Sequence, residues 1–313
     1  MSNSQAALSR TAYAVPPQLW FLVSAVFHYL GPSFAVLLFA RVDVLGVAWF
    51  RIASAAAVFA FCTRPWRTLA AASRRGLLLL LLFGACLAVM NSAFYLAIDR
   101  LPLSLVATIE FVATIAVALF GLRSWRNYAA LALAVAGVFA LTDLRWASDP
   151  LGLAYAVANG LLFVAYILLG HRLARDGAGE GVGRLGAAMA IAFAVVMPIG
   201  FREAMPAFAE PLLILAGIGV GVCSSVIPYV SDQLAMSRLP RNSFALMLAL
   251  LPATATAIGA LVLAQIPTPR DLLGIALVMA GIALHRQPNG VEEEDRKGFT
   301  AETQRRREER ERG

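Results

Sequence analysis

The sequence predicts an all-α membrane protein with ten transmembrane helices, arranged as two five-helix repeats of inverted topology. Of its 313 residues 60% are hydrophobic and only 14% are charged, about half the charged fraction of a soluble domain. Apolar runs such as 77–97 and 211–231 reach the ~20 residues with which an α-helix crosses ~30 Å of hydrocarbon. The runs are continuously apolar rather than alternating with period two, which argues against a transmembrane β-barrel.

Ten such runs are expected to cross the bilayer, and the fifth and tenth are the shortest. The first is not a cleaved signal peptide, because its apolar run is about twice the length of a signal core and further spans follow it. In chain order the expected spans are 19–40, 44–62, 76–97, 101–121, 127–142, 151–170, 185–201, 210–231, 242–265 and 270–285.

The basic residues of the loops predict the orientation. With the N-terminus in the cytoplasm, the inner loops carry Arg64, Arg67, Arg74, Arg75, Arg123, Arg126, Arg172, Arg175, Arg184, Arg238 and Arg241. The outer loops carry only Arg41, Arg100, Arg145, Arg202 and Arg270. This positive-inside bias places both termini in the cytoplasm. The net charge of +7 therefore reflects membrane topology and does not indicate a nucleic-acid partner.

Matching strings in the two halves predict an internal repeat. Arg100-Leu101-Pro102 follows the third span and Arg238-Leu239-Pro240 the eighth, while Gly137 and Gly281 mark the fifth and tenth spans. Chance similarity between Leu/Ala-rich helices is the alternative. Because five spans is an odd number, the second copy is inserted upside down, an arrangement that recurs in secondary transporters. The expected parts are an N-terminus (1–18), a first repeat (19–142), a second repeat (151–285) and a tail (286–313).

Motifs for several other classes of protein are missing. There is no nucleotide-binding G-x-x-x-x-G-K-[ST] loop, no zinc-binding H-E-x-x-H and no G-x-S-x-G elbow. Lys297, the single lysine, lies in the charged tail, which is expected to be solvated, with regulation as the alternative. Cys62, Cys86 and Cys223 lack paired spacing and are expected to pack. We predict no enzyme, no metal and no cofactor.

Charged residues within the expected spans are the first candidates for function, since a mid-membrane charge costs at least ~2.5–3.5 kcal/mol. Glu110 lies midway along the fourth span and could bind a substrate ammonium group or carry a proton. Arg51 in the second span could bind a carboxylate in bidentate fashion. The alternative is a structural ion pair between Arg51 and Glu110.

Polar and aromatic residues on the same helices complete the candidate site. His28 could titrate near neutral pH, with Tyr29 beside it and Pro32 one turn on, although a lone membrane histidine is more often a packing residue. Asp232 is expected at the inner interface, one turn from Tyr229.

Two further polar-aromatic faces suit either a cavity wall or plain interhelical hydrogen bonds. They consist of Asn91 with Tyr95 and of Asn159 with Tyr166. By contrast, a ridge of small residues spaced by four is expected to serve only close packing against another helix. It consists of Gly217, Gly221 and Ser225.

Several ordered strings resemble the EamA-type members of the drug/metabolite transporter superfamily, and specifically their threonine/homoserine exporter branch. The strings are Arg64-Pro-Trp-Arg67, Met90-Asn-Ser-Ala-Phe-Tyr-Leu-Ala97, Glu110-Phe111, Ala116-Val-Ala-Leu-Phe120, Pro228-Tyr229 and Arg238-Leu-Pro240. The similarity covers roughly residues 17–286 and leaves out the tail.

The resemblance implies a bacterial inner-membrane protein with a central cavity lined mainly by spans 1, 3, 4, 6, 8 and 9. It also implies proton- or gradient-linked export of small amino acids. The chain departs from that pattern at four places, where Val36 replaces a lysine, Thr114 a proline, Leu251 the glutamate of Glu-Pro, and Ala264-Gln265 a Gly-Glu pair. Losing the charged groups among them suggests a shifted or more apolar substrate.

Taken together, the expected function is alternating-access export of a small-molecule substrate across the lipid bilayer, with protons as a possible coupling ion. Efflux of hydrophobic or cationic toxic compounds is the first alternative. A membrane scaffold or sensor that signals through the tail is the second.

Overall fold

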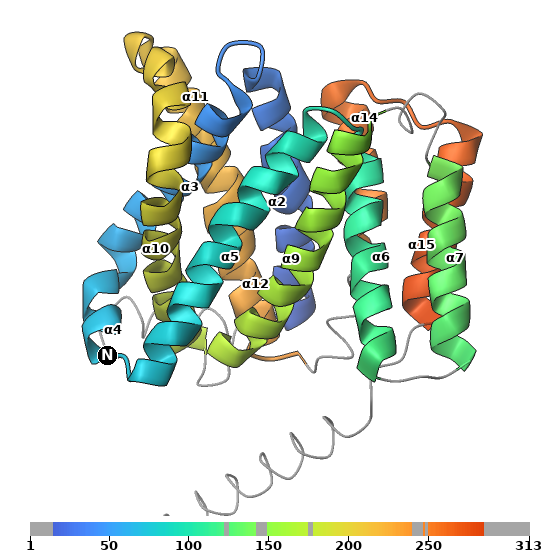
Figure 1. Cartoon of the computed structure of the whole chain (residues 1–313), viewed down its shortest axis with the longest axis horizontal. Coiled ribbons are helices and arrows are strands. Elements are labelled where there is room, and N and C mark those ends of the chain that lie inside the picture. Colours follow the sequence, from blue (N-terminus) through green and yellow to red (C-terminus); the bar gives the residue numbers. More distant parts are fainter. Residues whose placement is uncertain are drawn as a thin grey trace, which may run out of the picture.

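The computed structural model describes residues 15–121, 125–141, 149–174, 178–239, 247 and 250–284, without the side chains of 114–121, 141, 174, 178 and 179. Throughout these ranges the chain forms helices joined by short loops, and no strand occurs among them (Figure 1). The all-α prediction is therefore confirmed for this part of the chain. The predicted tail (286–313), residues 1–14 and the side chain of Thr114 lie outside the described residues.

The predicted first repeat is built from five long helices and one short one. The long helices are α2 (Pro17–Leu38), α3 (Val44–Thr63), α5 (Arg74–Ile98), α6 (Leu103–Gly121) and α7 (Trp125–Leu141). The short helix α4 (Pro65–Ala71) was not expected from the sequence. Side-chain caps explain two of the starts, since Asp43 accepts a hydrogen bond from the Leu45 N–H (3.0 Å) and Ser73 from the Gly76 N–H (3.1 Å).

The predicted second repeat contains two helices with irregular segments. Its helices are α9 (Pro150–Ala174), α10 (Ala178–Ala204), α11 (Pro211–Gly221), α12 (Ile227–Met236), α14 (Leu251–Leu263) and α15 (Pro269–Leu284). A 3₁₀ turn, η1 (Met205–Ala209), extends α10, and a π-helical turn, η2 (Val222–Val226), joins α11 to α12. The eighth expected span is thus one long helix with a π-turn at its centre.

Six helical stretches of the described chain are long and apolar enough to cross a membrane. They are Pro17–Leu38, Val44–Thr63, Arg74–Ile98, Pro150–Leu173, Glu180–Ala209 and Pro211–Met236. Two shorter apolar helices, Leu103–Ala113 and Leu251–Leu263, lie where the fourth and ninth spans were expected. Large apolar side chains such as Phe61 (90% exposed) and Leu261 (82%) face outward, as they do toward lipid. The count of ten crossings and the inverted repeat remain predictions.

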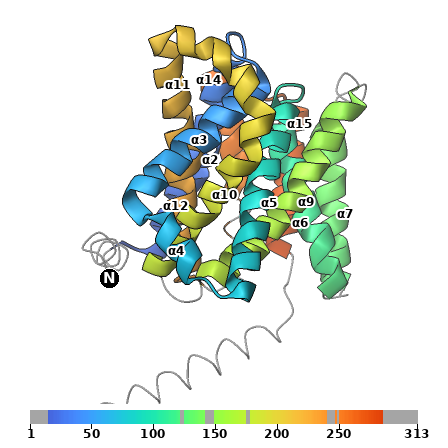
Figure 2. The same cartoon turned by 60° about the vertical axis from the view of Figure 1, so that its left-hand side comes forward.

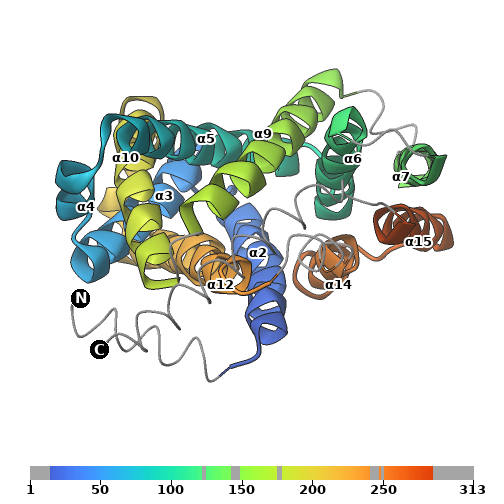
Figure 3. The same cartoon turned by 90° about the horizontal axis from the view of Figure 1, so that it is seen from below.

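The helices pack side by side in pairs. The closest pairs are α3 with α10, α7 with α15, and α5 with α9, while α2 lies against α12 and α14. Figure 2 shows α10 across α3, and Figure 3 shows α7 and α15 together at one end of the molecule. Helix α2 therefore lies between helices of the predicted second repeat, where its polar residues meet those of α12.

Candidate functional site

All ten residues singled out from the sequence are buried, and none is more than 8% exposed. They are His28, Tyr29, Arg51, Asn91, Tyr95, Glu110, Asn159, Tyr166, Tyr229 and Asp232. Burial of so many polar groups in an apolar bundle requires partners, because an unpaired polar group away from water costs free energy. Their hydrogen bonds therefore reveal how the site is built.

The Arg51 guanidinium is held by the eighth span. Its Nε donates to Ser225 Oγ (2.9 Å) and its Nη2 donates to the Ser224 carbonyl (2.9 Å) and to Tyr229 Oη (3.3 Å). It also lies over the Tyr95 ring, 5.0 Å from the centroid, where the π-face attracts a cation. Its Nη1 has no hydrogen-bond partner in the described part of the chain. The guanidinium is thus fixed in place with one donor nitrogen still available.

Pro228 explains why a backbone carbonyl is available to Arg51. Proline has no N–H, so the Ser224 carbonyl cannot receive the usual α-helical bond from the residue four positions on. The π-turn at Val222–Val226 lies just before this proline, and such turns are frequent at functional sites. The Arg51 Nη2 donates to the carbonyl that the proline leaves without its α-helical donor.

Asn91 and two tyrosines extend this cluster toward α5. Tyr229 donates from its hydroxyl to Asn91 Oδ1 (2.8 Å), and Asn91 Nδ2 donates to the Leu87 carbonyl of its own helix (2.6 Å). The hydroxyl of Tyr95 shares a hydrogen bond with Ser224 Oγ (3.3 Å). Helices α3, α5 and α12 therefore meet at one buried polar cluster.

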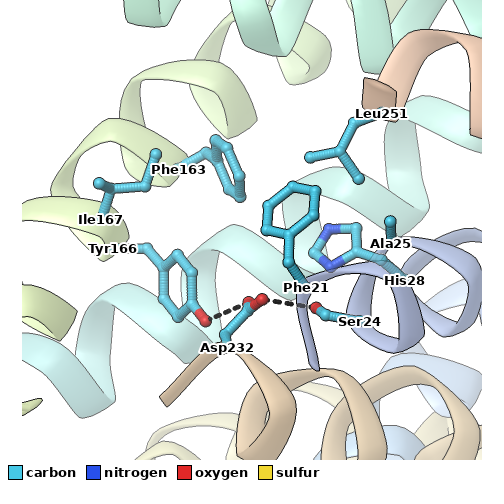
Figure 4. A pocket seen from close by; sticks show the side chains of 9 residues that line it. All are labelled: Phe21, Ser24, Ala25, His28, Phe163, Tyr166, Ile167, Asp232 and Leu251. Carbon is cyan, nitrogen blue, oxygen red and sulfur yellow. Dashed lines mark hydrogen bonds between the residues drawn. The ribbon is translucent and has the colours of Figure 1, made fainter. Parts of the chain in front are cut away.

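The Asp232 side chain faces the interior of the bundle, and its position at the inner membrane interface stays a prediction. Its carboxylate accepts from Ser24 Oγ (2.5 Å) and from Tyr166 Oη (2.7 Å), and the residue is 6% exposed (Figure 4). Helix α12 continues to Met236, so Asp232 is one turn inside the helix end, and Ser231 and Gln233 beside it are also buried. This polar run therefore faces the interior of the bundle.

A small cavity adjoins Asp232. It is lined by Phe21, Ser24, Ala25, His28, Phe163, Tyr166, Ile167, Asp232 and Leu251 (Figure 4). These residues come from α2, α9, α12 and α14, which correspond to spans 1, 6, 8 and 9 of the expected lining. The cavity has room for about one water molecule, so this state of the protein is nearly closed around it.

Glu110 belongs to a separate cluster on α6. Its Oε2 accepts a hydrogen bond from Asn159 Nδ2 on α9 (2.8 Å). Gly160 allows this contact, because a Cβ there would lie 3.1 Å from the Glu110 Cα and 2.9 Å from the Ala113 Cβ. Helix α9 can therefore approach α6 closely enough for its amide to reach the carboxylate.

The predicted ion pair between Arg51 and Glu110 is not formed. Both side chains are described, and no nitrogen of Arg51 lies within 4.0 Å of a Glu110 oxygen. The physical reason is the packing: α3 lies mainly against α10, and α6 lies mainly against α9 and α7. The two charges are close enough to interact electrostatically, but each takes its contacts elsewhere.

Comparison with known proteins agrees with this membrane architecture. A model of the EamA-like transporter family matches residues 150–286. The threonine/homoserine exporter RhtA of Escherichia coli (strain K12) is 33% identical over 253 residues, which cover 80% of this chain and 84% of that protein. The chain belongs to the EamA-like transporter family.

A second exporter of the same name and one solved structure extend the comparison. RhtA of Salmonella typhimurium (strain LT2) is 31% identical over 280 residues, covering 87% of this chain and 93% of that protein. A solved chain described only as "Crystal structure of protein" aligns with a TM-score of 0.56 at 16% identity, over 85% of this chain and 96% of that one, and shows a shared fold. Membership of a transporter family confirms the resemblance and the prediction that the chain is not an enzyme.

His28 lines the cavity in this EamA-like chain, and Tyr29 packs against His28. The His28 ring meets the edges of Tyr29 (centroids 5.4 Å apart) and Phe163 (6.1 Å), and it makes no hydrogen bond to a described residue. The Tyr29 hydroxyl has no hydrogen-bond partner in the described ranges either. Helix α2 continues past Pro32, so the proline does not interrupt it.

Sequence reasoning missed three residues of this region. Ser224 offers its carbonyl to Arg51 and its hydroxyl to Tyr95. Ser24 donates a hydrogen bond from its hydroxyl to Asp232. Gln233 is 1% exposed, with both amide atoms lacking a partner in the described chain. The position of Pro228 four residues after Ser224 was the one sequence feature that could have pointed to a Ser224 carbonyl without its α-helical donor.

No group of three His, Cys, Asp or Glu among the described residues could hold a metal ion.

Proposed function

We propose that this chain is a secondary transporter of a bacterial inner membrane that exports small amino acids of the threonine and homoserine type. The relatives named threonine/homoserine exporter match most of the chain at 31–33% identity, which supports this substrate class. The exporter works by alternating access between its two predicted halves.

The observation that carries the proposal is a buried polar seam between those halves. Within the described chain, six hydrogen bonds cross from α2, α3 and α5 to the eighth span. They join Ser24 to Asp232, Arg51 to Ser225, to the Ser224 carbonyl and to Tyr229, Tyr95 to Ser224, and Asn91 to Tyr229. Bonds of this kind can be exchanged for bonds to a substrate when the halves move, and transporter sites lie near the midplane at the repeat interface.

The inverted repeat and the orientation are part of this proposal. The family model matches residues 150–286, nearly the same unit as the predicted second repeat (151–285), which supports two similar halves. The arginine bias of the loops supports cytoplasmic termini. Fusing a reporter that is active only in the cytoplasm to either terminus tests the orientation, and inactive fusions at both ends would contradict it.

Proton coupling is assigned to Glu110 in this scheme. The carboxylate is 1% exposed and is held by the Asn159 amide, so it is shielded from water in this state. A carboxylate that alternates between such a site and water can take up a proton on one side and release it on the other. Arg51 lies within electrostatic reach and biases that exchange.

The test is efflux from proteoliposomes preloaded with radiolabelled threonine or homoserine, with and without an imposed pH gradient. We expect efflux by the wild type that the gradient accelerates, and gradient-independent efflux by Glu110→Gln. Undiminished, pH-responsive efflux by Glu110→Gln would remove Glu110 from coupling. Efflux of a cationic dye but of no amino acid would instead favour the export of toxic compounds. The aromatic rings of Phe21, Phe163 and Tyr166 in the cavity wall are the observation that favours this alternative.

A further inference from the structure

We infer that Asp232, together with Ser24 and Tyr166, forms the site that binds the primary ammonium group of the transported molecule. This assignment rests on the proposed function, because the ammonium belongs to the exported amino acid. It separates two roles that the sequence alone leaves to Glu110, namely substrate binding and coupling.

The first step concerns the charge of Asp232. Within the described part of the chain the carboxylate is bonded only by two neutral hydroxyl groups, and no basic side chain lies within 4.0 Å of it. A buried carboxylate inside a membrane bundle is costly unless a cation compensates it. Asp232 therefore offers a place for a cation that arrives from outside the protein.

The second step concerns the geometry of the donors. A primary ammonium group carries three N–H donors and no acceptor. Ser24 and Tyr166 now donate to Asp232, but hydroxyl groups rotate and also accept hydrogen bonds. When an ammonium group enters, one N–H can bond the carboxylate while the two hydroxyl oxygens accept the others. The site can thus satisfy all three donors without a further charge.

The third step concerns the cavity. Asp232 and both hydroxyl residues line it, and the rings of Phe21, Phe163 and Tyr166 surround the same space (Figure 4). Aromatic faces attract cations, and their apolar bodies strengthen the interaction with the carboxylate by excluding water. Leu251 closes the other side, so the cavity accommodates a short side chain better than a long one.

Glu110 lacks these features. It is not among the residues that line this cavity, and its Oε2 accepts a hydrogen bond from the Asn159 amide on α9. It therefore serves as the matched control: both carboxylates are buried in the bundle, but only one faces the space that a substrate would fill.

The experiment measures binding of L-threonine and of its 2-hydroxy analogue, in which a hydroxyl replaces the amino group, to purified full-length protein in nanodiscs. Simple primary amines complete the panel. We expect the wild type to prefer threonine by at least about tenfold. Asp232→Asn should abolish this preference, whereas Glu110→Gln should keep it within about threefold of the wild type.

Each outcome decides the assignment. If Glu110→Gln lost the preference for threonine over its 2-hydroxy analogue and Asp232→Asn kept it, the assignment of Asp232 would be overturned. The proposal that the protein exports amino acids would not be affected. Failure of the wild type to bind any amino acid or primary amine would also overturn the assignment. A wild type that exports no amino acid but binds primary amines through Asp232 would disprove the proposed function and keep this inference.

A second measurement on the wild type does not depend on the folding of a variant. A hydrophobic carbodiimide reacts with carboxyl groups in membrane interiors, and peptide mass spectrometry locates the adduct. We expect threonine, but not its 2-hydroxy analogue, to protect Asp232 from labelling. Equal labelling of Asp232 with and without saturating threonine would contradict the assignment.

Discussion

Ser24 on α2 donates a hydrogen bond of 2.5 Å to Asp232 on α12, across 208 positions of the sequence. The residues are 3% and 6% exposed, so water does not compete for this bond in the present state. Helix α2 is also packed along α12 and α14, which makes the bond part of a long apolar contact. Opening the cavity between these helices requires this bond to break or to be replaced.

The first prediction concerns that bond. Ser24→Ala removes one donor to a carboxylate, and hydrogen bonds to charged groups contribute about 1.5–3 kcal/mol in soluble proteins but average ~0.6 kcal/mol in membrane bundles. We expect a loss of about 1 kcal/mol in unfolding free energy and a severalfold weaker affinity for threonine. Thermal unfolding in detergent and equilibrium binding measure the two effects.

Ser33→Ala on the same helix is the matched control. Ser33 is fully buried, but its hydroxyl bonds the Tyr29 carbonyl of its own helix (2.9 Å) and makes no hydrogen bond to another helix of the described chain. We expect a change in affinity within about twofold, since such bonds contribute little across an interface. Equal effects of the two substitutions would show that the Ser24–Asp232 bond has no special role.

The second prediction concerns Arg51. Lysine keeps the charge but lacks the planar fork that reaches Ser225, the Ser224 carbonyl and the Tyr95 ring together. We expect Arg51→Lys to lower the efflux rate by tenfold or more, on the order of 1.4 kcal/mol. Arg100→Lys, at an exposed ion pair with Asp149 (3.4 Å), should change it by less than about twofold. A normal rate in Arg51→Lys would mean that charge alone suffices.

Much of the fold followed from hydropathy, because span length and apolarity are local properties of the chain. The expected first, second and third spans (19–40, 44–62, 76–97) agree with α2, α3 and α5 within about two residues. The burial of the polar residues could also be predicted from the sequence, because a charged side chain that faces the lipid costs free energy and is therefore expected to face the bundle interior. These predictions needed no knowledge of which helices are neighbours.

The partners of the polar residues did not follow, because they depend on neighbours and on rotation of each helix. Arg51 and Glu110 have opposite charges at similar depth, yet α3 and α6 pack mainly against different helices. Asp232 was placed at the interface because the apolar run ends before it, and hydropathy does not distinguish an inward-facing polar turn from a membrane surface. The hydrogen bonds to Ser24 and Tyr166 show the inward orientation of the side chain.

The third prediction concerns the start of α9. Asp149 accepts a hydrogen bond from the Gly152 N–H (2.8 Å), and this bond, with a smaller contribution from Arg100, holds the pKa of the carboxyl below its usual value. A lowered pKa in the folded state gives stability that is present above the unfolded pKa and is lost as the pH falls through the folded value. The stabilisation should therefore be complete at neutral pH and disappear below about pH 4.

Thermal unfolding of Asp149→Ala and Asp149→Asn across that range tests this assignment. We expect Asp149→Ala to lower the melting temperature at pH 7 and to converge on the wild type in acid. Asparagine also caps helices, so Asp149→Asn should keep most of the stability. A difference between wild type and Asp149→Ala that persists unchanged below pH 4 would rule out the ionised cap.

The last prediction uses two glycines of α11 with opposite surroundings. A Cβ at Gly221 would overlap the Ser54 hydroxyl and lie 2.8 Å from the Arg51 carbonyl, whereas a Cβ at Gly219 would meet nothing within 4 Å. Gly221→Ala should therefore push α3 away from the eighth span, at a cost of about 1–3 kcal/mol in stability. Gly219→Ala should be neutral or stabilising by up to ~1 kcal/mol, because alanine favours the helix.

The functional readout separates packing from general stability. Since Ser225, Ser224 and Tyr229 hold Arg51 from the displaced helix, Gly221→Ala should also weaken threonine binding severalfold, and Gly219→Ala should not. Thermal unfolding and binding on the same preparations give both quantities. Suppose Gly221→Ala and Gly219→Ala had the same stability and the same affinity for threonine. The close approach of α3 to α11 at Gly221 would then not be what positions the Arg51 guanidinium.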